Sequence, residues 1–121
     1  MTLNEYQKKA MSTCMPSCEN FCYMMLNLVG EVGEFASKVA KAIRKGEVTI
    51  DEEMLLPARI NHPFPNDFLE DLRAEAGDIL WQLSGLCDIM GWKLEDVAQG
   101  NLDKLASRKQ RGVIDGNGDN R

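Results

Sequence analysis

The sequence lacks the features of membrane and secreted proteins. None of its apolar runs approaches the roughly 18 residues that a membrane-spanning helix needs. The N-terminus has no apolar segment of the kind found in secretory signal peptides. Aromatic residues make up only 7% of the 121 residues, and there is a single histidine. We therefore predict a cytoplasmic protein with no membrane partner.

Basic charge is also scarce. The chain has 14 Lys and Arg against 19 Asp and Glu, which gives a net charge of -5. This sign is wrong for a protein that coats nucleic acid through phosphate contacts, so we expect no nucleic-acid partner. Residues 1–100 hold 9 basic and 16 acidic side chains, whereas residues 101–121 hold 5 basic and 3 acidic ones. An acidic body is therefore followed by a basic C-terminal segment.

Cysteine is too sparse for a disulfide scaffold, because the chain has only four thiols: Cys14, Cys18, Cys22 and Cys87. Steps of four would place the first three on one helical stripe, but Pro16 argues against a continuous helix there. A zinc site, with Cys87 or His62 as fourth ligand, is the alternative. We predict that these thiols have a structural or incidental role.

Apolar residues recur at intervals of three and four over most of the chain, which predicts helices and no strand of useful length. The expected helices cover residues 3–13, 17–45, 67–90 and 94–111. Asp67 and Glu70 have the spacing of a capping box at the third helix. In the last helix we expect the apolar side chains to face inward: Val97, Leu102 and Leu105.

Two segments break the helical pattern. Residues 47–66 contain three prolines and are predicted to be a long loop or partly ordered flap. Residues 112–121, the glycine-rich end of the basic segment 101–121, have no helical period and are expected to be a tail or a phosphate-approaching loop. The length fits one domain over residues 1–121. The predicted fold class is all-α, most simply an antiparallel four-helix bundle.

One pattern occurs twice, as Leu-x-x-Glu-x-Gly-acid-apolar over residues 28–35 and again over residues 72–79. The two acids of each pair are three residues apart, so both project from one side of their helix. The first acid of each pair interrupts the apolar stripe that should be buried. The four acids are Glu31, Glu34, Glu75 and Asp78.

Burying four neighbouring carboxylates costs several kcal/mol unless cations neutralise them. A site of oxygen ligands alone favours Mg²⁺, with Mn²⁺ as the alternative. A di-iron bundle would need a Glu-x-x-His motif, which is absent. A single pair would be read as a solvated helix face, whereas two matching pairs predict a metal site. Gly33 and Gly77 would then allow the two helices to approach closely.

Polar and basic residues on the last helix complement these acids. Asn101, Lys104 and Arg108 lie at positions i, i+3 and i+7, so they share one face and offer hydrogen-bond donors of the kind that bind phosphate. Lys38 and Arg111 add two further candidates. A solvated basic face is the alternative. Trp81 either stacks on a base or belongs to the core or a subunit interface, and we favour the second.

Taken together, these motifs resemble those of the MazG-like all-α nucleoside triphosphate pyrophosphohydrolases, relatives of dimeric dUTPases and phosphoribosyl-ATP pyrophosphohydrolase. The resemblance spans nearly the whole chain. It rests on the two acid pairs and on three further stretches: Tyr6-Gln7-x-x-Ala10-x-x-Thr13, Asn101-x-x-Lys104-x-x-x-Arg108-x-x-Arg111-Gly112 and a Gly-Asn-Gly-Asp-Asn-Arg ending.

The resemblance implies hydrolysis of a nucleoside triphosphate between the α and β phosphates, giving a monophosphate and pyrophosphate. It implies Mg²⁺ held by the four acids, with one acid orienting or deprotonating the attacking water, and a homodimer or homotetramer. One departure is the 40-residue separation of the acid pairs, longer than in compact members because residues 47–66 intervene. The alternatives are phosphoribosyl-ATP hydrolysis and a non-catalytic module that binds nucleotide and metal.

Overall fold

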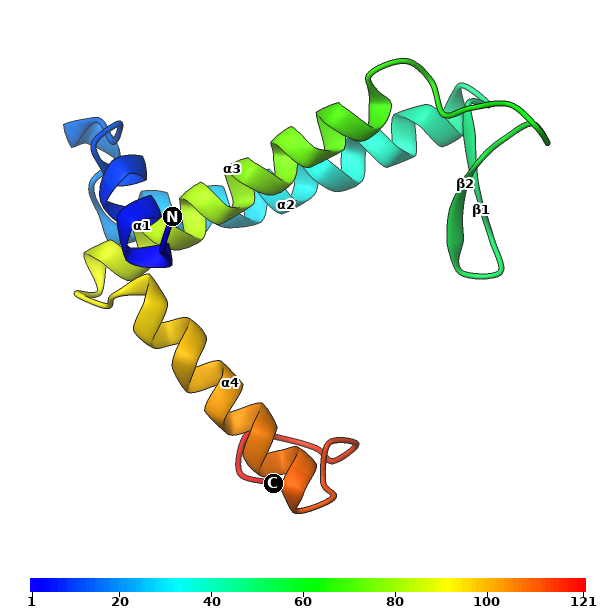
Figure 1. The fold of residues 1–121 in the computed structure, drawn as a ribbon. Helices are drawn as coiled ribbons and strands as arrows, with labels where there is room; N and C mark the ends of the chain where they lie inside the picture. The colour runs from blue at the N-terminus through cyan, green and yellow to red at the C-terminus, as the bar shows by residue number, and fades with distance from the viewer.

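The computed structural model describes residues 1–121 and is mostly helical (Figure 1). Its α-helices are α1 (Leu3–Met11), α2 (Phe21–Arg44), α3 (Phe68–Ile89) and α4 (Leu94–Gln110), with a short 3₁₀ turn, η1 (Pro16–Cys18), before α2. The four predicted helices are therefore confirmed, although α2 begins later than expected. No helix combines the length and the apolar character needed to cross a membrane.

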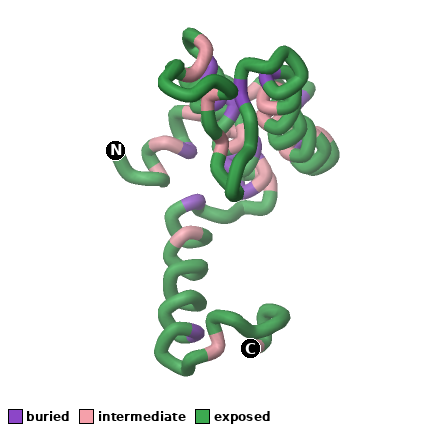
Figure 2. The backbone as a smooth tube through the Cα atoms, turned by 90° about the vertical axis from the view of Figure 1, so that its right-hand side faces the viewer, coloured by how far each residue is buried: buried purple, intermediate pink, exposed green.

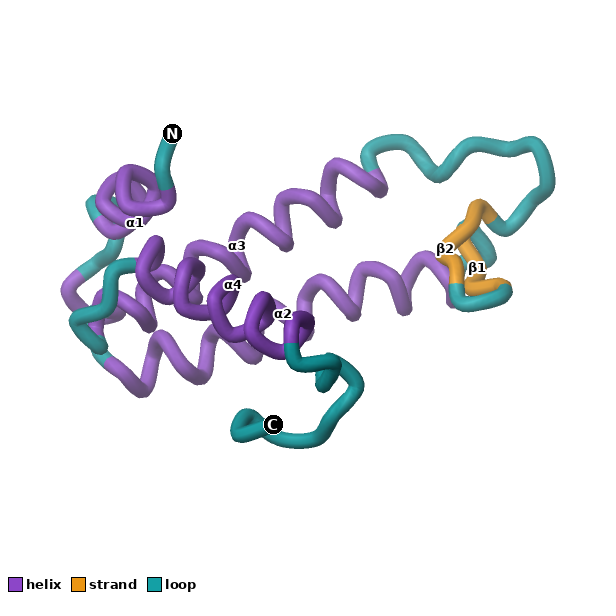
Figure 3. Tube along the Cα trace, turned by 60° about the horizontal axis from the view of Figure 1, so that its bottom comes forward, coloured by secondary structure: helices purple, strands orange, loops and turns teal.

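A β-hairpin occupies half of the segment predicted to be a loop (Figure 3). Strands β1 (Val48–Asp51) and β2 (Met54–Pro57) pair antiparallel, with Val48 opposite Pro57 and Asp51 opposite Met54. The expectation of no useful strand was wrong here. Glu52 and Glu53, which join the strands, both have positive φ. This geometry usually selects Asn or Gly, so the sequence carried no hairpin signal.

Helices α2 and α3 run antiparallel and form the most extensive contact in the molecule (Figure 1). Near the hairpin, Ala42 of α2 and Val48 of β1 pack with Phe68 and Leu72 of α3 in a buried apolar cluster. At the other end the helices approach closely at Gly85, where an added Cβ would lie 2.6 Å from the Met24 methyl carbon. Gly33 and Gly77, predicted to mark the close approach, have no neighbour within 4 Å of that position.

Helix α1 lies across α3 and is held by two side chains from the sequence motifs. The buried Gln7 amide donates to the Trp92 carbonyl oxygen at 3.0 Å and accepts from the Leu94 amide at 2.9 Å. The Trp81 indole donates to the Ala10 carbonyl oxygen at 3.1 Å. Trp81 is therefore a packing residue between α1 and α3 in this chain. Gln7 joins α1 to the start of α4.

The caps of two helices differ from the sequence pattern. Asp67 lies at the N-terminus of α3 with φ of 64° and its side chain makes no capping hydrogen bond, so the predicted capping box is absent. A capping box is present instead on α1, where Thr2 and Glu5 bond reciprocally. Acids in the first turn still favour the N-terminal end of the α3 dipole, and these are Glu70 and Asp71.

Helix α4 does not close a four-helix bundle. It begins beside α1 and α3 and then extends away from the α2–α3 pair (Figures 1 and 2). Along its length only Leu94 and Arg108 are buried. The predicted inward residues Val97, Leu102 and Leu105 are 39%, 59% and 40% exposed. A periodic apolar face predicts that one side of a helix packs against a partner, but it does not identify that partner.

Candidate metal centre and nucleotide site

Three of the four predicted acids come together between α2 and α3. One carboxylate oxygen from each of Glu31, Glu34 and Glu75 lies within 4.8 Å of the other two. Glu31 is half-buried, Glu34 is exposed and Glu75 is 8% exposed. Asp78, one turn beyond Glu75, is exposed and lies outside this group of three. The helical spacing of three residues explains why each pair faces one side.

Glu75 is the most buried acid of the cluster, and its two oxygens have different surroundings. Its Oε1 lies 3.2 Å from the Lys38 ammonium on α2, forming an ion pair across the two helices. Its Oε2 is buried and makes no hydrogen bond. An unpartnered buried carboxylate oxygen is costly for a protein, and a cation bound beside it would offset that cost.

Glu31 lies in an environment that disfavours its charged form. Burial raises the pKa of its carboxyl above the ordinary value, and the charges of Glu34, Asp78 and Glu75 raise it further. Asn27 opposes this effect by donating a hydrogen bond to Oε1 at 3.1 Å. Asp78 therefore acts electrostatically on the cluster. Its charge also contributes, after burial, to the raised pKa of Tyr6.

The chemistry of this donor set fits a hard divalent cation. All three converging ligand atoms are carboxylate oxygens, and no cysteine or histidine joins them. Oxygen-only ligation is typical of Mg²⁺ and Mn²⁺ rather than of zinc or copper. A divalent charge would also offset the mutual repulsion that raises the pKa of Glu31. The cluster is therefore compatible with a divalent metal.

An open pocket of about 360 Å³ adjoins the acids, lined by Glu34, Ser37, Lys38, Lys41 and Glu75. Three polar residues of this region were not singled out from the sequence: Asn27, Ser37 and Lys41. Each lies three, four or seven residues from an acid of α2, so helical spacing from Glu31 and Glu34 would have found them.

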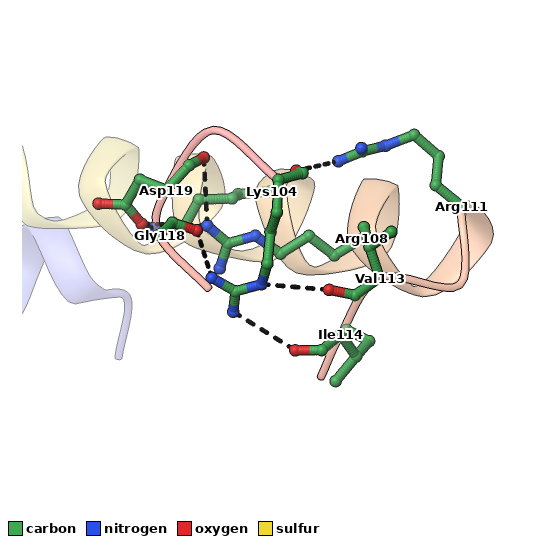
Figure 4. A network of polar contacts seen from close by, with 8 residues as sticks. Lys104, Arg108, Arg111, Val113, Ile114, Gly118 and Asp119 are labelled. Carbon is green, nitrogen blue, oxygen red and sulfur yellow. Dashed lines mark hydrogen bonds and ion pairs between the residues drawn. The ribbon is translucent and has the colours of Figure 1, made fainter. Parts of the chain in front are cut away.

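The predicted phosphate-binding residues of α4 lie apart from the acids, and three of them, Lys104, Arg108 and Arg111, contact the C-terminal tail (Figure 4). The Arg108 guanidinium lies 3.0 Å and the Lys104 ammonium 3.4 Å from the same carboxylate oxygen of Asp119. Arg111 donates to the Arg121 carbonyl oxygen at 2.7 Å, and Asn101 is exposed. The half of α4 that carries these residues points away from α2 and α3 (Figure 1). Within one chain they do not face the acids.

The three N-terminal cysteines occupy different environments. Cys14 is half-buried, Cys18 is buried and Cys22 is exposed, and all the cysteines are free thiols. Burial is the main cause that raises the pKa values of Cys14 and Cys87, which keeps these thiols in the less reactive protonated form. The thiols do not gather with His62 into a metal-binding group.

Comparison with known proteins identifies the class to which this fold and site belong. The sequence profile of the MazG nucleotide pyrophosphohydrolase domain matches residues 20–113. The chain therefore belongs to the MazG nucleotide pyrophosphohydrolase family, whose members use a divalent metal. It is also similar to the "Gene 37 protein" of Mycobacterium phage L5, with 41% identity over 105 residues that cover 87% of this chain and 80% of the phage protein. No solved structure matches the chain.

Proposed function

We propose that the protein is a Mg²⁺-dependent nucleoside triphosphate pyrophosphohydrolase. It would cleave ribo- or deoxyribonucleoside triphosphates between the α and β phosphates and release a nucleoside monophosphate and pyrophosphate. The observation that carries this proposal is the convergence of Glu31, Glu34 and Glu75, of which Glu75 has a buried, unpartnered oxygen, in a chain of the MazG family. Mn²⁺ is an alternative metal with the same ligand preference.

In this proposal four acids would hold the metal: Glu31, Glu34, Glu75 and Asp78. The bound cation would neutralise charge on the phosphates and on the pyrophosphate leaving group. One of the acids would orient or deprotonate the attacking water. Lys38 lies within reach of both the acids and the pocket, so it would donate to a phosphate when a cation takes over its role beside Glu75.

The remaining phosphate contacts would come from α4, through Asn101, Lys104, Arg108 and Arg111. Because this part of α4 points away from the acids of its own chain, the proposed enzyme is a homodimer or homotetramer in which α4 of one copy approaches the acids of another (Figure 1). Exposed apolar residues support such an assembly, with Leu26 and Val29 on α2 and Leu102 on α4 all more than half exposed.

We further propose that residues 1–121 form one MazG-like domain, with residues 47–66 as an insertion and residues 112–121 as a glycine-rich tail that ends the basic segment 101–121. The segments outside the matched range pack against those inside it, because α1 contacts α3 and the tail folds onto α4. The four free thiols suit a reducing compartment, so the proposed substrates belong to the cytoplasmic nucleotide pool.

The decisive experiment incubates the chain with Mg²⁺ and a panel of ribo- and deoxyribonucleoside triphosphates, and with phosphoribosyl-ATP. Products are separated by ion-exchange chromatography. We expect equal amounts of monophosphate and pyrophosphate from at least one triphosphate. Release of orthophosphate, or Mg²⁺-dependent nucleotide binding with no product, would reject the proposal, and the second result would indicate a non-catalytic nucleotide-binding module.

Two variants connect this activity with the acids. Glu34→Gln and Asp78→Asn change exposed side chains, so both should fold normally while turnover falls by at least about a hundredfold. Glu70→Gln is the matched control, because Glu70 is an acid of α3 whose only ion pair is with Arg73. The proposal fails if all three variants retain the same activity.

A further inference from the structure

One oxygen atom of the C-terminal tail joins two cations of α4. Asp119 Oδ1 lies 3.0 Å from an Arg108 guanidinium nitrogen and 3.4 Å from the Lys104 ammonium (Figure 4). Two positive side chains that contact the same oxygen repel each other, and the charge of the shared carboxylate offsets that repulsion. Asp119 therefore bridges the two cations.

The tail that carries Asp119 is fastened by contacts that do not involve this residue. The Arg121 guanidinium donates to the carbonyl oxygens of Val113, Ile114 and Gly118, and Arg111 donates to the Arg121 carbonyl oxygen (Figure 4). Gly118 has φ of 75°, a conformation that favours glycine and turns the chain directly before Asp119. The tail is thus a turn held by hydrogen bonds rather than a free segment that a ligand would displace.

Arg108 has the features of a residue prepared for an anion. Its side chain is 6% exposed, and its Nε is buried without a hydrogen-bond partner. Only one guanidinium nitrogen, Nη2, contacts Asp119. Lys104 uses one donor on Asp119 and is 42% exposed. Because a guanidinium has five N–H donors and an ammonium three, donors of both residues remain for a second anion.

We propose that Asp119 is a positioning residue that holds Lys104 and Arg108 together as a two-point binding site for a phosphate group of the nucleotide. This inference rests on the proposed function. It assigns a role to the Gly-Asn-Gly-Asp-Asn-Arg ending, in which Gly118 and Arg121 shape the turn and Asp119 orients the cations. Asp119 does not contact the reacting atoms.

A competing interpretation makes the opposite prediction. If Asp119 occupied the place of a phosphate and competed with it, removing its charge would strengthen anion binding. If Asp119 positions the cations, the same change would weaken binding, because the two cations would separate. The fastening of the tail by Arg121 favours positioning, since a competing carboxylate would have to leave together with a turn held by other bonds.

The test compares Asp119→Asn with Asp115→Asn, which removes a tail carboxylate that forms no ion pair. Binding of inorganic pyrophosphate in the presence of Mg²⁺ is measured by calorimetry, and kcat and KM are measured with the best triphosphate. Asp119→Asn should weaken pyrophosphate binding about tenfold and raise KM by a similar factor, with kcat changed less than about twofold. Asp115→Asn should match the unaltered chain.

A spectroscopic measurement keeps the test independent of catalysis. The Arg108 Nε–H signal in ¹⁵N–¹H spectra should shift in Asp119→Asn and stay in place in Asp115→Asn. Three results would each overturn the inference. These are tighter pyrophosphate binding in Asp119→Asn, an unmoved Arg108 signal in that variant, and no pyrophosphate binding by the unaltered chain. Unchanged binding and KM in an active enzyme would also overturn it and leave the proposed function intact.

The reverse outcome is also distinguishable. If the unaltered chain hydrolyses no nucleotide, yet Asp119→Asn weakens pyrophosphate binding and shifts the Arg108 signal, the proposed function fails and the role of Asp119 stands as part of an anion-binding site.

Discussion

Lys38 on α2 and Glu75 on α3 form an ion pair of 3.2 Å beside the acid cluster. The pair leaves Oε2 of Glu75 buried and without a partner. Lys38 therefore offsets only part of the cost of burying Glu75. This relationship links the stability of the α2–α3 pair to the chemistry of the site.

Removing the ammonium should destabilise the metal-free chain. Lys38→Met is expected to lower the free energy of unfolding by about 1 kcal/mol in EDTA, a value discounted for solvent because Lys38 is 39% exposed. Adding Glu75→Gln to this variant should restore part of the loss, since no buried charge then remains. Urea unfolding measures both. Lys41→Met is the control, because it removes a lysine of the same pocket that forms no ion pair. Equal losses of unfolding free energy in Lys38→Met and Lys41→Met would contradict the prediction.

Divalent metal should stabilise the fold, because a ligand that binds only the native state raises stability. At a Mg²⁺ concentration 100 times its dissociation constant, the gain is about 2.7 kcal/mol. Thermal unfolding with and without Mg²⁺ should show a clear rise of Tm in the unaltered chain and a much smaller one in Glu34→Gln. Glu70→Gln should respond like the unaltered chain. An equal rise in both variants would place metal binding elsewhere.

Alanine substitutions at two glycines should change the free energy of unfolding in opposite directions. Gly85→Ala places a methyl group against the buried Met24 side chain and is expected to cost about 1–3 kcal/mol. Gly33→Ala meets no neighbouring atom and should stabilise α2 by up to about 1 kcal/mol. Urea unfolding in EDTA compares the two variants. A destabilising Gly33→Ala would indicate that another surface lies against this part of α2.

The tail ion pairs predict a specific pH dependence. Hydrogen bonds from Arg108 and Lys104 hold the pKa of Asp119 below its ordinary value. Because the pKa of Asp119 is lowered in the folded state, its ion pairs add to the free energy of unfolding. This contribution is fully present above the unfolded-state pKa of about 3.9 and is lost as the pH falls through the folded-state pKa. Carboxyl ¹³C NMR should follow this titration. Lys104→Ala should raise the pKa of Asp119, and titration at the ordinary aspartate value in the unaltered chain would refute the contact.

Much of the helical framework could be predicted from apolar spacing. The long helices α2 and α3 carry apolar residues every three or four positions, and Gly46 and Gly91 follow their ends with positive φ. The hairpin could not be predicted, because Glu52 and Glu53 form its turn in a conformation that glutamate seldom adopts. The direction of α4 could not be predicted either, since the spacing of Leu102 and Leu105 does not identify their partner.

Part of the acid cluster could also be predicted from the sequence, for a different reason. A spacing of three residues places two carboxylates on one side of a helix whatever the tertiary structure, so the pairs were visible in sequence. Which acid is most buried depends on the packing of α2 against α3, and only the structure distinguishes Glu75 from Glu34. The bridge from Asp119 to Lys104 and Arg108 requires a turn that returns the chain over α4, which residue spacing alone does not predict.

The attachment of α4 at its first residue has a mechanical consequence. Gln7 bonds to Trp92 and Leu94 at the base of this helix, and few other contacts hold it along its length. Arg108 lies 14 residues beyond Leu94, about 21 Å along the axis, so a tilt of about 10° at the base would carry it through about 4 Å. A small change of angle at the base of α4 would thereby become a displacement longer than a hydrogen bond at the far end of the helix.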